Sequence, residues 1–237
     1  MDPEMKEYER FLPTQEAMSI YYDGSAEEQH KRMYEIIQAA SQTKTAEELF
    51  DFTDTDICNR VRMGTPSIYM NLYQTLFAMS GVKTVLEIGT FIGLSTMQFA
   101  QFVGEKGKVT GIEKFDEFAD IAQENFEKNN LSERIELIRG DATDVLKQFK
   151  YGQFDFAYID GSKENYWNYF KALDQIADKG AIIVVDDVFF TGDVINQDCT
   201  TEKGNGCKEF LENIAKLDTY NTCVLPVSSG VCISVKK

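Results

Sequence analysis

Histidine is nearly absent from this chain, which carries a single one, His30, in a polar N-terminal stretch. Histidine is the side chain whose charge changes most readily near neutral pH, so histidine-based catalysis is not expected. Long apolar runs are also absent, and no segment is long enough to cross a membrane. The opening residues, Met1-Asp2-Pro3-Glu4, do not form a signal peptide. We therefore expect a cytoplasmic protein with no membrane partner.

Cysteine is scarce and scattered, with residues Cys58, Cys199, Cys207, Cys223 and Cys232. The number is odd, and no two cysteines have the close spacing of a metal site, which is typical of a protein in a reducing compartment. Cys199 and Cys207 share one loop and could pair under oxidation, but reduced thiols are expected.

Basic residues are outnumbered, 24 against 39 acids, and the formal net charge is −15. Such a surface repels phosphate backbones, so nucleic acid is not an expected partner. The hydrophobic content of 43% is ordinary for a globular protein. The length of 237 residues suits one main domain with an added helical piece.

The most informative stretch runs from Lys83 to Met97. We interpret it as a buried strand at 84–88, a turn containing Gly89 and Gly93, and a helix whose first turn includes Ser95. Free amide groups at such a turn favour a nucleotide-like cofactor. The same pattern also fits an ordinary strand–helix turn, so the glycines alone leave both interpretations open.

Strands and helices alternate after this stretch. Further strands are predicted at 108–113, 134–139, 154–160, 181–186, 221–227 and 231–235, and helices at 26–40, 45–52, 66–79, 116–129, 164–177 and 208–217. Helices between successive strands predict an α/β fold with a doubly wound, mostly parallel seven-stranded sheet. The last two strands are joined by a short connection, so one of them should be antiparallel.

Acidic residues occur at or just after the ends of several predicted strands, namely Glu87, Glu113, Asp141, Asp160, Asp186 and Asp187. Any one of them could cap a helix. Together they should meet at the carboxyl edge of the sheet, where ligands bind in such folds. Glu113 follows Gly93 by 20 positions, the offset at which an acid meets ribose hydroxyls in nucleotide-binding units.

Several motifs in order resemble the class I S-adenosylmethionine-dependent methyltransferases, and more narrowly the cation-dependent caffeoyl-CoA and catechol O-methyltransferase family. They are Glu87-Ile88-Gly89-Thr90-Phe91-Ile92-Gly93-Leu94-Ser95, Arg139-Gly140-Asp141-Ala142, Asp160-Gly161-Ser162-Lys163-Glu164-Asn165-Tyr166, Val185-Asp186-Asp187-Val188-Phe189-Phe190-Thr191-Gly192 and Leu225-Pro226-Val227-Ser228-Ser229-Gly230. The resemblance implies a Rossmann-like methyltransferase domain at 63–237 and a variable N-terminal helical cap at 1–62.

The resemblance also implies roles for individual residues. Those expected to bind S-adenosylmethionine are Met63, Thr65, Glu87, Gly89, Ser95, Glu113, Asp141, Ala142 and Asp160. Asp160, Asp186 and Asp187 would bind a divalent cation, and Lys163 would accept a proton, with Asp160 beside it. An all-oxygen ligand set suits Mg²⁺ best, with Ca²⁺ or Mn²⁺ as alternatives. The expected reaction is methyl transfer to a hydroxyl of a small catechol-like substrate.

Two positions depart from the family pattern. The family usually has Asn where this chain has Asp187, and several plant-type members have an acid where it has Ser162. The second departure leaves the phenylpropanoid-CoA substrate open. Phe189, Phe190 and Tyr166 are candidates for the substrate wall, although Tyr166 equally suits a core or subunit contact.

The residues leave some alternatives open. Lys163 could be a solvated surface lysine, or a nearby cation and partial burial could lower its pKa and make it a base. The alternative functions are metal-independent methyl transfer to another small-molecule nucleophile, a non-catalytic cofactor-binding module and a nicotinamide-dependent dehydrogenase. The family resemblance also implies a homodimer, for which the aromatic N-terminal segment is the expected contact.

Overall fold

The structure of the chain is a computed structural model, and it describes residues 24–42, 44–51, 65, 67–150 and 152–237. The chain divides into two compact units, Met1–Thr45 and Ala46–Lys237. The domain boundary predicted between residues 62 and 63 lies outside the described residues. The predicted cofactor residue Met63 lies outside them as well.

In the first unit the described structure is mainly one helix, α3 (Ala26–Ser41), close to the predicted 26–40. A capping box begins it: the Glu28 amide donates to the Ser25 hydroxyl, and the Ser25 amide donates to the Glu28 carboxylate. Large apolar side chains on this helix are exposed, namely Met33, Tyr34, Ile36 and Ile37. The helix therefore has apolar side chains that the described residues of its own unit leave uncovered.

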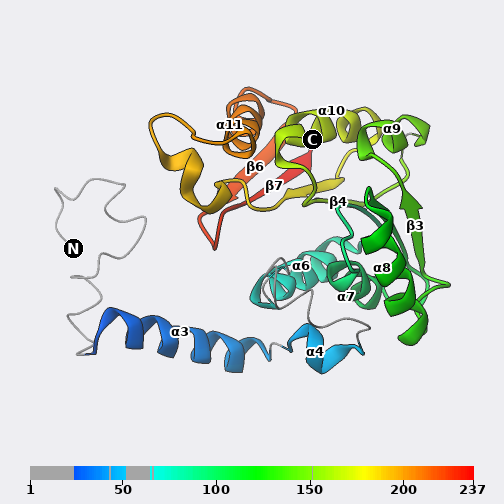
Figure 1. Cartoon of the computed structure of the whole chain (residues 1–237), viewed down its shortest axis with the longest axis horizontal. Coiled ribbons are helices and arrows are strands. Elements are labelled where there is room, and N and C mark those ends of the chain that lie inside the picture. Colours follow the sequence, from blue (N-terminus) through cyan, green and yellow to red (C-terminus); the bar gives the residue numbers. More distant parts are fainter. Residues whose placement is uncertain (1–23, 43, 52–64, 66, 151) are drawn as a thin grey trace. The chain divides into compact units, whose positions relative to one another are not determined.

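The second unit is built on one seven-stranded sheet (Figure 1). Its strands are β1 (Thr84–Ile88), β2 (Lys108–Glu113), β3 (Ile135–Arg139), β4 (Phe156–Ile159), β5 (Ile182–Val185), β6 (Tyr220–Leu225) and β7 (Val231–Lys236). Their order is β3-β2-β1-β4-β5-β7-β6, and only β7 is antiparallel to its neighbours. The predicted α/β fold with a late antiparallel strand is confirmed.

Helices cover both faces of the sheet. They are α4 (Ala46–Leu49), α6 (Ser67–Ser80), α7 (Leu94–Phe102), α8 (Asp116–Lys128), α9 (Ala142–Val145), α10 (Tyr166–Ile176) and α11 (Glu202–Ile214), with short 3₁₀ turns η1 (Leu146–Gln148), η2 (Lys163–Asn165) and η3 (Phe190–Ile195). Helices α9, α10 and α11 lie on one face, and α6, α7 and α8 on the other (Figure 1).

The sheet has a hydrophobic core on each face, and each strand contributes side chains to both cores in alternation, because successive side chains of a strand point to opposite faces. In β4, Ala157 and Ile159 belong to the core under α10 and α11, whereas Phe156 and Tyr158 belong to the core under α6 and α7. Both faces are thus buried, as the apolar sequence of these strands predicts.

Two helices differ from the sequence prediction. The helix predicted at 45–52 is only the short α4, because the Asp51 amide and carbonyl instead bond to the Asn129 side chain. The helix predicted at 208–217 begins earlier, at Glu202, with Thr201 as its N-cap. No described helix combines the length and apolarity that crossing a bilayer requires.

Candidate active site

A cavity of about 670 Å³ lies beyond the carboxyl ends of β1, β2, β4 and β5. Its walls come from the loops that follow these strands and from the turn between β6 and β7. This is the edge of a parallel sheet at which ligands bind. Of the predicted site residues, those that line it are Thr65, Gly89, Ser95, Glu113, Ala142, Asp160, Lys163, Asp186, Asp187 and Phe190.

The turn after β1 passes very close to the end of β4. Gly89 has φ 98°, and a Cβ atom there would overlap the carbonyl oxygen of Asp160. Gly93, with φ 90°, is the N-cap of α7 and leaves no space between the turn and the Phe126 ring. Only glycine combines this backbone with this proximity, so both glycines are required for the shape of the turn.

Glu113 holds that turn from the end of β2. Its carboxylate accepts a hydrogen bond from the Phe91 amide at 2.7 Å and from the Phe115 amide at 2.9 Å. The side chain is 5% exposed and lines the cavity. One carboxylate therefore fixes the loops after β1 and β2 together while retaining further acceptor capacity.

Glu87 lies behind this wall and is not part of it. The side chain is fully buried and accepts hydrogen bonds from the hydroxyls of Ser95 and Thr96. Burial raises its pKa to about 8, although the two hydroxyls act in the opposite direction. Glu87 thus reaches the cavity only through Ser95, which does line it.

Asp141 also has a supporting position. It caps α9 by accepting hydrogen bonds from the Thr143 amide and hydroxyl, which hold its pKa below the usual range. Its other oxygen lies 3.1 Å from the Lys114 ammonium. Lys114 lines the cavity, as do Gly140 and Ala142 on either side of Asp141 in the sequence.

Three phenylalanines that the sequence analysis did not single out as site residues line the same end. The Phe118 ring packs edge to face against two others, with 4.6 Å between its centre and that of Phe91 and 5.8 Å between its centre and that of Phe115. Phe115 is 57% exposed, which is unusual for a large apolar side chain. Its exposure beside a cavity is the signal that could have indicated a ligand contact, but sequence alone does not give exposure.

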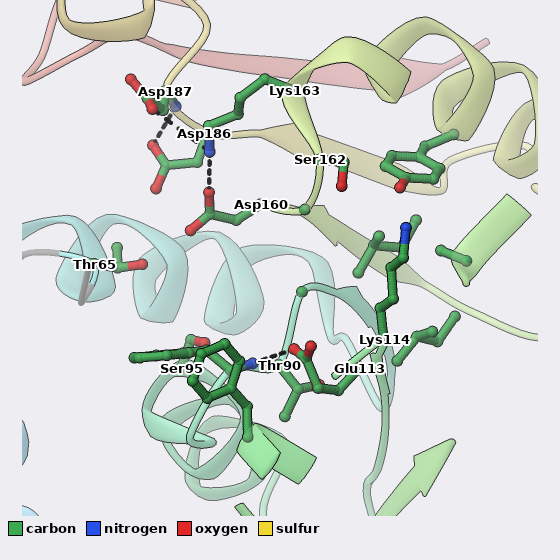
Figure 2. Close-up of a pocket in the computed structure, with 18 of the residues that line it drawn as sticks. Thr65, Thr90, Ser95, Glu113, Lys114, Asp160, Ser162, Lys163, Asp186 and Asp187 are labelled. Carbon is green, nitrogen blue, oxygen red and sulfur yellow. Dashed lines mark hydrogen bonds and ion pairs between the residues drawn. The ribbon is translucent and has the colours of Figure 1, made fainter. Parts of the chain in front are cut away.

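The three acids predicted to bind metal surround Lys163 (Figure 2). The Lys163 Nζ atom lies 2.6 Å from Asp160 Oδ1 and 3.5 Å from Asp187 Oδ2. Asp186 accepts hydrogen bonds from the Tyr158 hydroxyl at 2.5 Å and from the Asp187 amide at 2.8 Å. Figure 2 shows this cluster on the opposite side of the cavity from Glu113 and Ser95.

Charge in this cluster is partly desolvated. Burial raises the pKa of Asp160 despite Lys163, and burial together with Asp160 raises that of Asp186 to about 6. Burial alone would lower the pKa of Lys163, but the neighbouring carboxylates outweigh it and leave that pKa raised. Two ion pairs thus stabilise the ammonium form, and the lowered pKa expected next to a bound cation stays a prediction.

The cluster has the donor chemistry for a divalent cation. Its donors are carboxylate oxygens, and Asp187 Oδ1 is buried without a hydrogen-bond partner among the described residues. As arranged here, no three acid, cysteine or histidine side chains of the described residues converge as a metal site. The Lys163 ammonium lies between Asp160 and Asp187 and neutralises part of their charge.

Only one of the three predicted aromatic wall residues reaches the cavity. Phe190 lines it. Phe189 packs beneath Gly230, and its amide donates to the Ser229 carbonyl at 2.7 Å. Tyr166 is fully buried on the inner face of α10, and its hydroxyl donates to the Asp186 carbonyl. Tyr166 therefore supports the loop after β5 rather than forming its surface.

Other residues of the site were outside the predicted set. Tyr158 is predicted only as part of a strand and does not itself line the cavity, but its hydroxyl connects Asp186 with the Thr65 hydroxyl, which is 3.0 Å away. Lys203, Ser228 and Ser229 also line the cavity. Lys203 lies outside the motifs quoted above, and Ser228 and Ser229 belong to a motif that by itself indicates only the connection between the last two strands.

Several proteins are similar to this chain in sequence or in fold. Probable caffeoyl-CoA O-methyltransferase 3 of Dictyostelium discoideum is 26% identical over 80% of this chain and 83% of its own length. Catechol O-methyltransferase of Mycobacterium tuberculosis is 36% identical over 48% of this chain and 51% of its own length. The crystal structure of an O-methyltransferase from Bacillus cereus in complex with SAH has a TM-score of 0.71 and 26% identity, covering 97% of this chain and 99% of that one.

A family model described as O-methyltransferase matches residues 37–237, which is most of the chain. The matched region includes every strand of the sheet and every described residue that lines the cavity. The chain therefore belongs to the O-methyltransferase family.

Proposed function

We propose that the protein transfers a methyl group from S-adenosylmethionine to a hydroxyl of a small catechol-like substrate, with the help of a divalent cation. The observation that carries this proposal is one cavity with two chemically different ends. One end has a glycine turn, a ribose-type carboxylate and aromatic rings. The other has a cluster of acids around a lysine.

The first end suits the methyl donor. Glu113 keeps acceptor capacity for ribose hydroxyls beyond its two amide donors. Phe115 and Ala142 offer apolar surface for a planar base. The Bacillus cereus relative was solved in complex with SAH, which supports the same class of ligand here. The proposal extends to Met63, which lies outside the described residues.

The second end suits the methyl acceptor. Asp160, Asp186 and Asp187 would hold the cation, which when bound would act as a Lewis acid toward a catechol oxygen. Lys163 would accept the hydroxyl proton, and the ion pair with Asp160 holds its amine toward the cavity. Phe190 would form part of the wall for the aromatic ring. Methyl transfer then depends mainly on the alignment of oxygen, methyl carbon and sulfur.

A second candidate function is methyl transfer without metal. It is favoured by the position of the Lys163 ammonium, which already provides positive charge between two of the three acids. In that case the lysine alone would stabilise the acceptor oxygen, and the acids would serve to position the lysine.

Methylation of catechol, assayed with Mg²⁺ and then with EDTA, separates these functions. We expect turnover that EDTA abolishes and Mg²⁺ restores. Turnover that is insensitive to EDTA would establish the metal-independent alternative. If calorimetry shows binding of S-adenosylmethionine but no catechol of a panel is methylated, the protein is a non-catalytic cofactor-binding module. If calorimetry shows binding of NAD and not of S-adenosylmethionine, the cofactor assignment is refuted.

We also propose that the protein forms a homodimer. The support is the group of exposed apolar side chains on α3, since exposed apolar surface commonly marks protein contacts.

A further inference from the structure

Among the described residues, three lysines line the cavity, and they differ in their ion-pair partners. Lys114 pairs with Asp141 at 3.1 Å, and Lys163 pairs with Asp160 at 2.6 Å. Lys203 makes no ion pair with any described residue. It is therefore the lysine of this wall whose charge is left for a ligand.

Lys203 belongs to the end of the cavity that contains Lys163. Its ammonium lies 5.8 Å from the centre of the Phe190 ring. The first turns of α11 pack directly on η2, because Gly206 has no Cβ atom that would overlap Glu164 and lie 2.5 Å from the Lys163 carbonyl oxygen. The lysine and the proposed proton acceptor are thus carried by two backbone segments in contact.

The backbone that carries Lys203 is held firmly. Asp193 accepts four hydrogen bonds of 2.8–3.0 Å, from the amides and hydroxyls of Thr200 and Thr201. These bonds hold the pKa of Asp193 well below its usual range. Gly204 packs against the same carboxylate, with no space for a Cβ atom. The start of α11 is therefore fixed relative to η3.

Helix stability does not explain a lysine at this position. Lys203 is in the first turn of α11, where the helix dipole disfavours positive charge. The surrounding wall is rich in carboxylates, namely Asp160, Glu164, Asp186 and Asp187. These would repel a negatively charged substrate group, and Lys203 is placed to counter that repulsion.

We propose that Lys203 binds an anionic group of the methyl acceptor, a carboxylate or a phosphate, with the aromatic ring of that acceptor near Phe190. This rests on the proposed function. The acceptor is then a catechol whose ring carries a negatively charged side chain, and Lys203 is the residue that distinguishes it from a neutral catechol.

The test uses three acceptors that share one catechol ring: caffeate with a free carboxylate, its neutral methyl ester, and its coenzyme A thioester with phosphates. Steady-state kinetics are measured for the wild type, Lys203→Met and Lys203→Arg. Lys216→Met is the control, since it removes the same charge from an exposed position of the chain that does not line the cavity. Lys203→Met should raise the KM of at least one anionic acceptor about tenfold.

The same variant should leave the kcat for that acceptor, the KM of the ester and the KM of S-adenosylmethionine unchanged. Lys203→Arg should restore the wild-type KM of the anionic acceptor, and Lys216→Met should have the wild-type KM for every acceptor. An effect on caffeate identifies a carboxylate, and an effect on the thioester alone identifies a phosphate. The inference would be overturned if Lys203→Met raised the KM of the ester and of the anionic acceptors equally, or raised none of them. Absence of turnover of every acceptor by the wild type would refute the proposed acceptor class itself.

Discussion

Lys163 has two carboxylate partners, and these decide how it could act as a base. The ion pairs with Asp160 and Asp187 keep its pKa above the ordinary value, so the neutral amine is scarce near neutral pH. Replacement by alanine should lower kcat by roughly 10²–10⁴ while cofactor binding is retained. The measurement is kcat against pH, and the wild-type rate should rise as pH increases.

A Lys163→Arg variant separates the proton transfer from the ion pairs. Arginine keeps the positive charge between the acids but does not release its proton. We expect it to be as impaired as the alanine variant. A fully active arginine variant would mean that Lys163 only neutralises the acids.

Asp187 combines an unusual backbone with an unusual side chain. Its φ is 53°, in the left-handed region that Asn also tolerates, so Asp187→Asn should fold normally. The variant has one negative charge fewer, and we expect it to need more Mg²⁺ for half-maximal rate. Its pH–rate profile should shift to lower pH, because Lys163 then has fewer carboxylates to stabilise its ammonium form. A Mg²⁺ titration and pH profile in which neither midpoint moves would exclude Asp187 as a ligand.

Glu87 makes the free energy of unfolding depend on pH. Its pKa in the folded protein is about 8, above the ordinary 4.5, so the folded state holds the proton more tightly. The stabilisation is complete below the ordinary pKa and is lost as pH rises toward 8. Glu87→Gln should remove that loss, which is on the order of 2–5 kcal/mol. The measurement is urea unfolding of the ligand-free wild type and Glu87→Gln variant at several pH values between 4.5 and 8. If the free energy of unfolding depends on pH in the same way in both proteins, the prediction is contradicted.

At the scale of elements, local patterns predicted the sheet well. The run Ile182–Val185 is apolar throughout, and Val85–Ile88 is apolar except for Glu87, because both faces of the sheet are covered, and this signal is local in sequence. The predicted start of α11 at residue 208 was wrong, because Gly204 and Gly206 have a low helix propensity. The structure keeps them in the helix for tertiary reasons, since each permits a close contact with Asp193 or Glu164.

The faces of elements were harder to predict than their existence. In α6 the helical spacing of Ile68, Leu72, Leu76 and Met79 predicts one buried stripe, whereas the buried residues are Met70, Tyr73 and Phe77, and Met79 is 78% exposed. The helix is apolar around most of its surface, so periodicity does not select one face. Similarly, motif order indicated Glu87 and Tyr166 as site residues, but only the packing places both behind the cavity wall.

Gly206 connects helix packing to chemistry. Alanine would favour the helix by about 1 kcal/mol, but its Cβ atom would overlap the backbone of Glu164. The overlap involves backbone and should dominate, with a net destabilisation of about 1–3 kcal/mol. Because η2 also carries Lys163, kcat should fall as well. Urea unfolding and turnover are compared with Glu209→Ala, an exposed position on the same helix. A variant as stable and active as this control would contradict the prediction.

At the scale of the whole molecule, the two units should be separable. The unit Ala46–Lys237 holds all seven strands and every described residue of the cavity. A chain shortened to this unit should unfold cooperatively and bind S-adenosylmethionine like the full chain, as shown by calorimetry. Light scattering should give a dimer for the full chain and a monomer for the shortened one if α3 forms the contact. A dimeric shortened chain would place the contact elsewhere.

The place of β7 in the sheet has a consequence for synthesis on the ribosome. β7 is the last strand in sequence, yet it lies between β5 and β6, and among the described strands β6 pairs only with β7. While the chain emerges from its N-terminal end, β6 therefore has no partner until β7 leaves the exit tunnel. Ser228 and Ser229, in the turn between these strands, can complete the cavity only then. A nascent chain should thus acquire the Ser228–Ser229 part of the cavity wall as the final step of its assembly.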